Sequence, residues 1–213
     1  MAAVTLVMAT KNPGKVREMA ELLRDLGVRL LSLADFPEIP DIPEEGATFA
    51  ENALAKARTV ARLTGLAALA DDSGLEVEAL GGRPGVYSAR YAQDRTAGRT
   101  PTDQDNWQKL LDELREVPEG RRAARFVCEI ALVTPGGRLL TSRGELAGLI
   151  TREPRGTRGF GYDPVFWVPA YQATVAELDL AAKNRISHRG GALRQLKERL
   201  AERKEEFFTA PPQ

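Results

Sequence analysis

The chain has 213 residues, of which 43% are hydrophobic and 28% charged, a composition typical of a globular protein with one sizeable core. Thirty basic residues balance 30 acidic ones, which excludes a protein whose whole surface is built to bind nucleic acid. The single cysteine, Cys128, excludes an intrachain disulfide and favours a reducing compartment; its apolar surroundings favour a packed thiol over a nucleophile. The sequence shows neither a secretory signal nor about 20 consecutive apolar residues, so we expect a cytoplasmic protein without a membrane span.

In the first part of the chain, short apolar runs alternate with an amphipathic segment. Residues 4–9 predict a buried strand, and apolar residues spaced by three and four from Val16 onward predict a helix that Gly27 ends. A second strand is expected over residues 28–33. The following segment, 35–46, contains three prolines and five acidic residues and predicts a loop.

The next helix and strand are predicted from residues typical of the ends of such elements. Thr48 and Glu51 match a capping box, in which each side chain accepts from the other residue's backbone N–H, so we expect a helix from there to Gly65. The apolar run 66–70 predicts a short strand. We expect this strand to end abruptly at the acidic pair Asp71-Asp72.

The middle of the chain predicts a glycine-rich loop, a helix and a hairpin. Residues 81–85 form the loop, and Thr102 or Asp103 could cap the helix. Two apolar runs, 125–134 and 138–145, flank a Pro-Gly-Gly sequence and predict a pair of strands joined as a hairpin.

The C-terminal part contains a second glycine-rich loop, expected over residues 156–164, and a short strand over 165–168. Residues 175–206 have a helical pattern that is interrupted near 187–191, and the charged run 197–206 is interpreted as the solvated face of a helix. Strands and helices in this order predict an α/β protein with a mixed sheet.

One candidate phosphate site lies between the first strand and the first helix. A helix N-terminus offers N–H groups and partial positive charge to phosphate, and two lysines here add charge. The alternative is a capped turn with solvated lysines, and the segment is not a Walker A loop. The residues are Thr10, Lys11, Asn12, Pro13, Gly14 and Lys15.

Adjacent carboxylates suggest a metal site. Asp71 and Asp72 would repel each other unless a cation compensates, and magnesium prefers oxygen ligands. The alternative is a polar turn in which an aspartate serves as a cap. In the acidic loop, Glu44 or Glu45 could be a second ligand, although a solvated loop explains them as well.

The second glycine-rich loop suggests a site for a base. Phe160 lies between glycines and precedes Asp163, and Lys183 and the segment 187–189 supply cations further along. Stacking of a base on an aromatic ring is worth roughly 1–3 kcal/mol. His188 is the only histidine, and alone it would be interpreted as a surface or packing residue. A phosphate site, a carboxylate pair and a base site together indicate a nucleotide enzyme.

Six blocks of sequence, in this order, resemble the inosine/xanthosine triphosphate pyrophosphatases, also called the HAM1-like family. The resemblance runs from about Leu6 to Leu200. The blocks are TKNPGK (10–15), EEGATFAENALAKA (44–57), ADDSGLEV (70–77), GVYSARYA (85–92), ITREPRGTRGFGYDPVF (150–166) and SHRGGAL (187–193).

The resemblance implies a single two-lobed α/β domain over residues 1–213, with an elongated mixed sheet, flanking helices, an active-site cleft between the lobes and assembly as a homodimer. It implies magnesium-dependent hydrolysis of non-standard purine nucleoside triphosphates to the monophosphate and pyrophosphate. Thr10, Asn12 and Lys15 would hold the triphosphate within the 10–15 segment. Glu44 and Asp72 would bind Mg²⁺, Asp72 would be the general base, and Ser73 would touch the nucleotide. The nucleoside pocket would comprise Phe160, Gly161, Tyr162, Asp163, Lys183, His188 and Arg189.

Three questions stay open at this point. Asp72 cannot easily be both a full metal ligand and a free base. A related house-cleaning enzyme of the Maf type would act on modified pyrimidines instead. A nucleotide-sensing module without catalysis is the third possibility, although such a module needs no metal-linked carboxylates beside its phosphate site.

Overall fold

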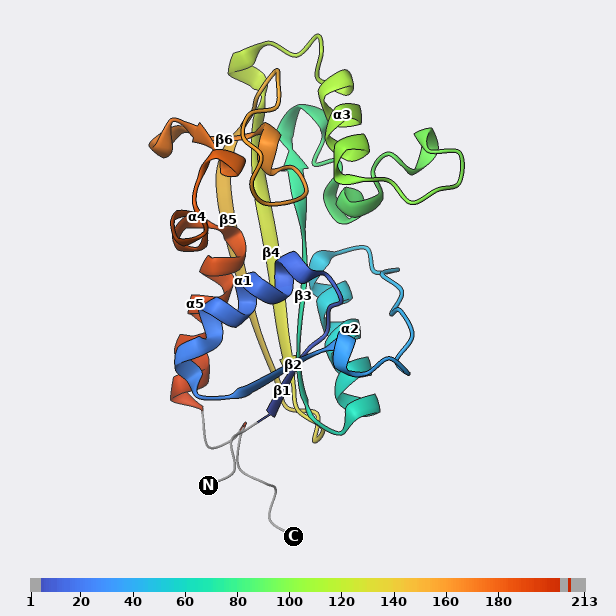
Figure 1. Cartoon of the computed structure of the whole chain (residues 1–213), viewed down its shortest axis with the longest axis vertical. Helices are drawn as coiled ribbons and strands as arrows, with labels where there is room; N and C mark the ends of the chain where they lie inside the picture. Colours follow the sequence, from blue (N-terminus) through green and yellow to red (C-terminus); the bar gives the residue numbers. More distant parts are fainter. Residues whose placement is uncertain (1–4, 204–206, 208–213) are drawn as a thin grey trace. The chain divides into compact units, whose positions relative to one another are not determined.

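The computed structural model describes residues 5–203 and residue 207 (Figure 1). Within these residues seven strands are hydrogen-bonded in the order β2-β1-β3-β4-β5-β6-β7. β1 pairs in parallel with β2 and β3, whereas β6 pairs antiparallel with β5 and β7. The strands are β1 (Thr5–Met8), β2 (Arg29–Ser32), β3 (Ala67–Val77), β4 (Ala123–Val133), β5 (Leu139–Ile150), β6 (Phe166–Val168) and β7 (Ala173–Thr174).

Helices flank this mixed sheet, which confirms the predicted α/β class. They are α1 (Pro13–Leu23), α2 (Phe49–Thr64), α3 (Asp103–Glu113), α4 (Leu180–Ile186) and α5 (His188–Glu202). Among the residues that the structure describes, none of the helices combines the length and the apolar composition that a membrane span requires.

The chain divides into two compact units. Unit 1 contains the chain up to Asp72, the segment Cys128–Gly144 and the chain from His188 on. Unit 2 contains Ser73–Val127 and Glu145–Ser187. Assignment of the whole chain to one domain with a cleft stays a prediction.

In unit 1, helices pack on both faces of the sheet, and alternate residues of β3 face opposite sides. Leu69 packs in one cluster with Met19 of α1 and Leu193 of α5, and these two helices lie next to each other (Figure 1). Ala70 packs in a second cluster with Ala57 of α2. Residues 71 and 72 continue this alternation, so the next two side chains of β3 are directed to different helices.

Unit 2 has a core of its own. Leu75 at the end of β3 packs with Leu110 and other apolar residues of α3. The rings of Phe126 and Phe166 lie with their centroids 4.3 Å apart in the same cluster. This core supports the segment between β5 and β6, which carries the glycine-rich loop.

Several predicted ends of elements are confirmed. Both halves of the Thr48–Glu51 capping box are formed, and Gly65 ends α2 in the left-handed conformation. Gly27 also adopts a left-handed conformation, after a short 3-10 turn that follows α1. Of the two candidate caps of α3, Thr102 is the one used. The strands of the predicted hairpin are present, but β5 continues to Ile150, beyond the predicted residue 145.

Cys128 is fully buried in β4, as predicted, and burial raises the pKa of its thiol. Two predictions fall partly outside the described residues: Val4 in the first strand, and residues 204–206 in the charged C-terminal run.

The predicted end of the third strand was wrong. β3 does not stop at residue 70 but continues through Asp71 and Asp72 to Val77. Both aspartates are buried, with exposed fractions of 2% and 5%. A strand can contain two adjacent buried carboxylates because each has its own partners on its own face of the sheet: Lys15 and Arg189 for Asp71, and Asn52 and Lys56 for Asp72.

The predicted interruption near residues 187–191 was also too wide. Only Ser187 leaves the helical conformation, as the extended cap of α4. α5 begins at His188, so His188 and Arg189 lie in the first turn of a helix and not in a loop.

Candidate functional site

The N-terminus of α1 is capped by its own asparagine. The Asn12 side chain accepts hydrogen bonds from the N–H groups of Gly14, at 2.9 Å, and Lys15, at 3.1 Å. Pro13 has no N–H to offer. The N–H of Asn12 in turn donates to the Thr10 hydroxyl at 3.1 Å. The helix-end N–H groups expected for phosphate therefore already donate to Asn12, and a phosphate that used them would have to displace its amide oxygen.

The two lysines of this segment have different surroundings. Lys15 Nζ lies 3.0 Å from Asp71 Oδ2, and its side chain is only 17% exposed. Lys11 Nζ lies 2.8 Å from Asp41 in the acidic loop, where the carboxylate is 91% exposed. Lys15 is therefore part of a partly buried cluster, whereas Lys11 makes a solvent-exposed pair.

Asp71 is the centre of a buried ion network on the α1 and α5 side of the sheet. Its Oδ2 accepts from Arg189 Nε at 3.2 Å and Nη2 at 3.1 Å, in addition to the contact with Lys15. Arg189 Nη1 donates to the buried carboxylate of Glu18 on α1. Burial alone would raise the pKa of Asp71, but the charges of Lys15, Arg189 and Lys56 outweigh burial and hold this pKa well below its usual range.

This network changes the interpretation of Arg189. The sequence predicts a base ligand in a loop, but the side chain is only 2% exposed and forms ion pairs with Asp71 and Glu18 within unit 1. His188 is also buried, at 8% exposure, in the first turn of α5. The roles of both residues toward a base stay predictions.

Asp72 lies on the opposite face of the sheet, among residues of α2. Its Oδ2 accepts from Asn52 Nδ2 at 2.9 Å, and its Oδ1 lies 3.5 Å from Lys56 Nζ. The same ammonium lies 2.7 Å from Glu44 Oε1 and donates to the backbone carbonyl of Asp71. Glu44 and Asp72 therefore share one cation, whereas Glu45, the other candidate from the acidic loop, is exposed.

The pKa values of Asp72 and Lys56 are both raised, whereas that of Asp71 is lowered. Burial raises the pKa of Asp72, the nearby charge of Glu44 adds to this, and Lys56 only partly opposes it. Burial would lower the pKa of Lys56, but Asp72, Asp71 and Glu44 together raise it, so Lys56 stays charged. Adjacent carboxylates whose pKa values are shifted in opposite directions are a pattern found where acid–base chemistry takes place.

Two residues of this group were missed in the sequence. Asn52 and Lys56 are buried in α2, four residues apart, so they lie on one side of the helix. The Asn52 amide connects Asp72 to the acidic loop, because its oxygen accepts from Gly46 N at 2.7 Å. A side chain at Gly46 would collide with that oxygen, since its Cβ would lie 2.7 Å away. Two polar residues one turn apart in an alanine-rich helix were the available signal.

The donor set of unit 1 fits a divalent cation. Magnesium takes oxygen ligands and usually binds through one or two carboxylates, with waters and phosphate oxygens completing its shell. Glu44 and Asp72 are such a pair, and the described residues contain no group of three or more potential ligands that would suit a metal held by protein alone. Carboxylates also outnumber cations in these ion pairs: Glu18, Glu44, Asp71 and Asp72 against Lys15, Lys56 and Arg189.

Three of the predicted base residues, Phe160, Asp163 and Lys183, come together within unit 2, whereas His188 and Arg189 belong to unit 1. Lys183 Nζ forms a buried ion pair with Asp163 Oδ2 at 2.7 Å and lies 4.4 Å from the centroid of the half-buried Phe160 ring. The same Asp163 oxygen accepts from the N–H of Phe160 at 3.0 Å. A Cβ at Gly159 would lie 2.0 Å from that oxygen, so the close approach of the loop to Asp163 requires glycine there.

Two other residues that were predicted to contact the nucleotide are Tyr162 and Ser73. Tyr162 is buried in the unit 2 core and donates its hydroxyl to the Ser88 carbonyl at 2.8 Å; burial raises the pKa of this phenol. Tyr162 therefore anchors the loop rather than offering a polar surface. Ser73 follows Asp72 on β3 and is half-buried, at the start of unit 2.

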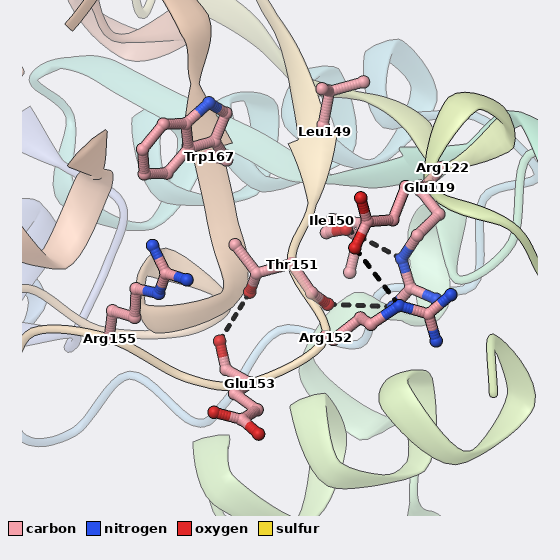
Figure 2. A pocket seen from close by; sticks show the side chains of 9 residues that line it. All are labelled: Glu119, Arg122, Leu149, Ile150, Thr151, Arg152, Glu153, Arg155 and Trp167. Atoms are coloured by element: carbon pink, nitrogen blue, oxygen red, sulfur yellow. Dashed lines mark hydrogen bonds and ion pairs between the residues drawn. The ribbon is translucent and has the colours of Figure 1, made fainter. Parts of the chain in front are cut away.

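A pocket of about 450 Å³ lies elsewhere in unit 2 (Figure 2). It contains none of the predicted site residues. Arg122 is buried at its edge and donates to the carbonyls of Ile150, at 2.8 Å, and Thr151, at 2.8 Å. Because this guanidinium also donates to the carbonyl of Leu114, it connects the end of β5 to the segment after α3 and thereby stabilises the fold.

The model of the Ham1 family matches residues 6–199. A dITP/XTP pyrophosphatase of Geobacter sulfurreducens is 56% identical over 92% of this chain and 96% of its own length. The structure of a HAM1 protein from Coxiella burnetii superposes with a TM-score of 0.83 and 49% identity, covering 93% of this chain and 99% of the other. A nucleoside-triphosphatase / dITP/XTP pyrophosphatase from Mycobacterium abscessus gives a TM-score of 0.72 and 45% identity, covering 92% and 99%. The match to the family model over most of the chain and the high identity of these relatives establish that this chain belongs to the Ham1 family.

Proposed function

We propose that this chain hydrolyses non-standard purine nucleoside triphosphates, such as those of inosine, deoxyinosine and xanthosine, to the monophosphate and pyrophosphate. The observation that carries the proposal is the geometry around β3: Asp71 pairs with Lys15 and Arg189 on one face, whereas Asp72 and Glu44 share the ammonium of Lys56 on the other face. The pKa of Asp71 is lowered and that of Asp72 is raised, in keeping with these surroundings. Relatives at about 50% identity that are named dITP/XTP pyrophosphatases support the choice of substrate.

In the proposed reaction, water attacks the α-phosphorus, the bond from this phosphorus to the bridging oxygen breaks, and pyrophosphate leaves. Asp72 accepts the proton from the attacking water, a role that suits a carboxylate whose pKa is raised by burial. Lys56 and Lys15 supply positive charge on the two faces of β3, where it can offset the charge of the phosphates.

Magnesium is the proposed cofactor, and Glu44 and Asp72 would hold it. Because Asp72 is also the proposed base, its two carboxylate oxygens would have to divide the two roles. When bound, it would neutralise phosphate charge and polarise the oxygen atoms around the reacting phosphorus. Asn52 fixes the orientation of the Asp72 carboxylate, so that one oxygen is held while the other stays near Lys56. Holding Asp72 in this way reduces the reorganisation that proton transfer requires.

The preference for keto purines is proposed from their hydrogen-bonding pattern. Inosine and xanthosine carry an acceptor at position six and a donor at the neighbouring ring nitrogen, and adenosine reverses both. A buried donor left unpaired costs about 1–3 kcal/mol, so two mismatches can exclude adenosine strongly. Phe160 would stack on the base, and the ammonium of Lys183 beside it is a candidate donor.

A pyrophosphate-release assay tests the proposal. Inosine, deoxyinosine, xanthosine and adenosine triphosphates would be compared with and without Mg²⁺. We expect the kcat/KM for inosine triphosphate to exceed that for adenosine triphosphate by at least about a hundredfold, with turnover lost when EDTA removes the metal. Preferred hydrolysis of modified pyrimidine triphosphates would favour the Maf-type alternative. Tight binding of inosine triphosphate without turnover in the presence of Mg²⁺ would favour a sensor.

Two further properties are proposed from the resemblance and the composition. The chain would form a homodimer, which sedimentation would detect as twice the chain mass of 23.3 kDa. It would work in the cytoplasm, where nucleotide pools are found and where a single buried thiol needs no partner.

A further inference from the structure

The loop Gly159–Asp163 is attached to three separate elements of unit 2. The Asp163 carboxylate pairs with Lys183 of α4, and the Tyr162 hydroxyl donates to Ser88 in a 3-10 turn. The third attachment lies at the centre of the loop, where the N–H of Gly161 donates to Asp103 Oδ2 at 2.7 Å. Asp103 is 58 residues away in the sequence, outside the motifs that pointed to a nucleotide site.

The contact has a specific backbone requirement. Gly161 has φ of +62°, a left-handed conformation that favours glycine. In this conformation its N–H points toward Asp103 on α3. Phe160 is the residue immediately before it. The Asp103 carboxylate on α3 therefore constrains the peptide bond between Phe160, the proposed stacking residue, and Gly161.

Asp103 is not needed to cap its own helix. The cap of α3 is Thr102, whose hydroxyl accepts from Asp105 N while Asp105 accepts from Thr102 N at 2.7 Å. An acidic residue in a first turn also interacts favourably with the helix dipole, but that effect requires only charge. The hydrogen bond to Gly161 requires an acceptor oxygen at this position.

We propose that Asp103 is a positioning residue for the base site: by accepting from Gly161 N it holds the Phe160 side of the loop in place to receive a purine. This inference rests on the proposed function, in which Phe160 stacks on the base. Asp103 acts through the loop backbone, so its effect should fall on binding of the base and not on binding of the phosphates.

Three variants separate these roles. Asp103→Ala removes the acceptor, Asp103→Asn keeps an acceptor oxygen without the charge, and Gln104→Ala changes the adjacent exposed residue of the same turn as a matched control. Calorimetry would measure the binding of inosine monophosphate, which carries a base, and of inorganic tripolyphosphate, which does not. Amide hydrogen exchange at Gly161 would report on the hydrogen bond itself.

For Asp103→Ala we expect about tenfold weaker binding of inosine monophosphate, a rise in the KM for inosine triphosphate larger than any fall in kcat, and at least about tenfold faster exchange at Gly161. Binding of tripolyphosphate should change by less than about twofold. Asp103→Asn should restore most of the affinity, and Gln104→Ala should match the wild type.

Equal weakening for both ligands, or unchanged Gly161 exchange in Asp103→Ala, would overturn the inference. If Asp103→Asn is as impaired as Asp103→Ala, charge and not the acceptor matters, and the inference also fails. A wild-type protein that hydrolyses no keto purine triphosphate, while exchange at Gly161 still depends on Asp103, would overturn the proposed function but leave the attachment of the loop intact.

Discussion

Asp71 and Asp72 are neighbours on β3 but lie in two different regions of unit 1. Asp71 faces α1 and α5, where Lys15 and Arg189 contact it directly. Asp72 faces α2, where Asn52 donates to it and the ammonium of Lys56, which pairs with it, also pairs with Glu44. Successive side chains of a strand point to opposite faces, so one residue step separates the two environments.

The difference shows how one strand can combine stability with reactivity. The depressed pKa of Asp71 means that its charged form is favoured by folding, so this carboxylate stabilises the protein at neutral pH. The raised pKa of Asp72 means the opposite, because its charge is less favourable in the folded chain than in the unfolded one. We infer that Asp71 builds the site and that Asp72 is retained for its chemistry.

We expect the largest effect, a loss of free energy of unfolding, for Asp71→Asn. The substitution leaves the buried Arg189 and the partly buried Lys15 without their shared carboxylate, and breaking a buried ion pair costs about 3–5 kcal/mol. Urea unfolding at pH 7 would measure the loss of the free energy of unfolding. Asp72→Asn is the matched control and should be as stable as the wild type or more so. Equal destabilisation by both variants would show that the two regions do not differ as described.

Arg189→Ala tests the same network from its cationic side. Without the guanidinium, Asp71 and Glu18 are left as buried carboxylates, and we expect a comparable loss of about 3–5 kcal/mol. Because Arg189 contacts these carboxylates, the hydrolysis of inosine and adenosine triphosphates should fall by the same factor. Parallel kinetics with the two substrates, under conditions where the variant is folded, measure this. A smaller ratio of inosine triphosphate hydrolysis to adenosine triphosphate hydrolysis in the variant would instead support the base-binding role of Arg189 predicted from the sequence.

Asp72→Asn should have the next largest effect, now on activity. The amide keeps the shape of the side chain but cannot take a proton, and loss of a general base costs at least about a hundredfold in rate. Pyrophosphate release from inosine triphosphate at saturating Mg²⁺ would measure it, alongside a circular dichroism spectrum as the control for folding. Near-normal turnover would remove Asp72 from the reaction.

Much of the fold could be predicted because its signals are local. The Thr48–Glu51 capping box and the glycine that ends α2 each depend on residues within a few positions, and both are confirmed. The motif residues Phe160, Asp163 and Lys183 were also predicted to act together, and the structure places them in contact.

What could not be predicted depended on partners far away in the chain. Two adjacent aspartates favour the end of a strand, unless cations compensate them. Two of the three cations that do so here could not be recognised: Arg189 lies 118 residues from Asp71, and Lys56 is a single charged residue on the buried side of an alanine-rich helix. The role of Asn52 was missed for the same reason, because its two partners converge only in the folded chain.

A smaller effect is expected for the lysines before α1. Lys15→Ala removes a partly buried cation beside Asp71 and should reduce kcat/KM about tenfold, near the 1.4 kcal/mol expected of a charge-assisted contact. The reduction should be the same for every base if Lys15 meets the phosphates. Lys11→Ala is the matched control and should change kcat/KM by less than about twofold, because its pair with Asp41 is solvent-exposed. A loss that depends on the base would reverse the proposed orientation of the nucleotide.

The smallest effect is a difference in how the two aspartates make stability depend on pH. An unfolded aspartate has a pKa of about 3.9, and that of Asp71 in the folded chain is far lower. Its contribution is therefore complete above about pH 5 and is lost as the pH falls below 4, at roughly 1.4 kcal/mol per pH unit. The gap in unfolding free energy between the wild type and Asp71→Asn should thus narrow by about 1 kcal/mol between pH 4 and pH 3. Asp72 has the opposite sign: its pKa is raised, so its ionised form disfavours folding at neutral pH. Any advantage of Asp72→Asn should shrink as the pH falls below that raised pKa and be gone below the unfolded pKa of about 3.9. Urea unfolding of the three proteins from pH 3 to pH 7 would measure both trends. Curves for the two variants that run parallel to each other would contradict the assignment of opposite shifts.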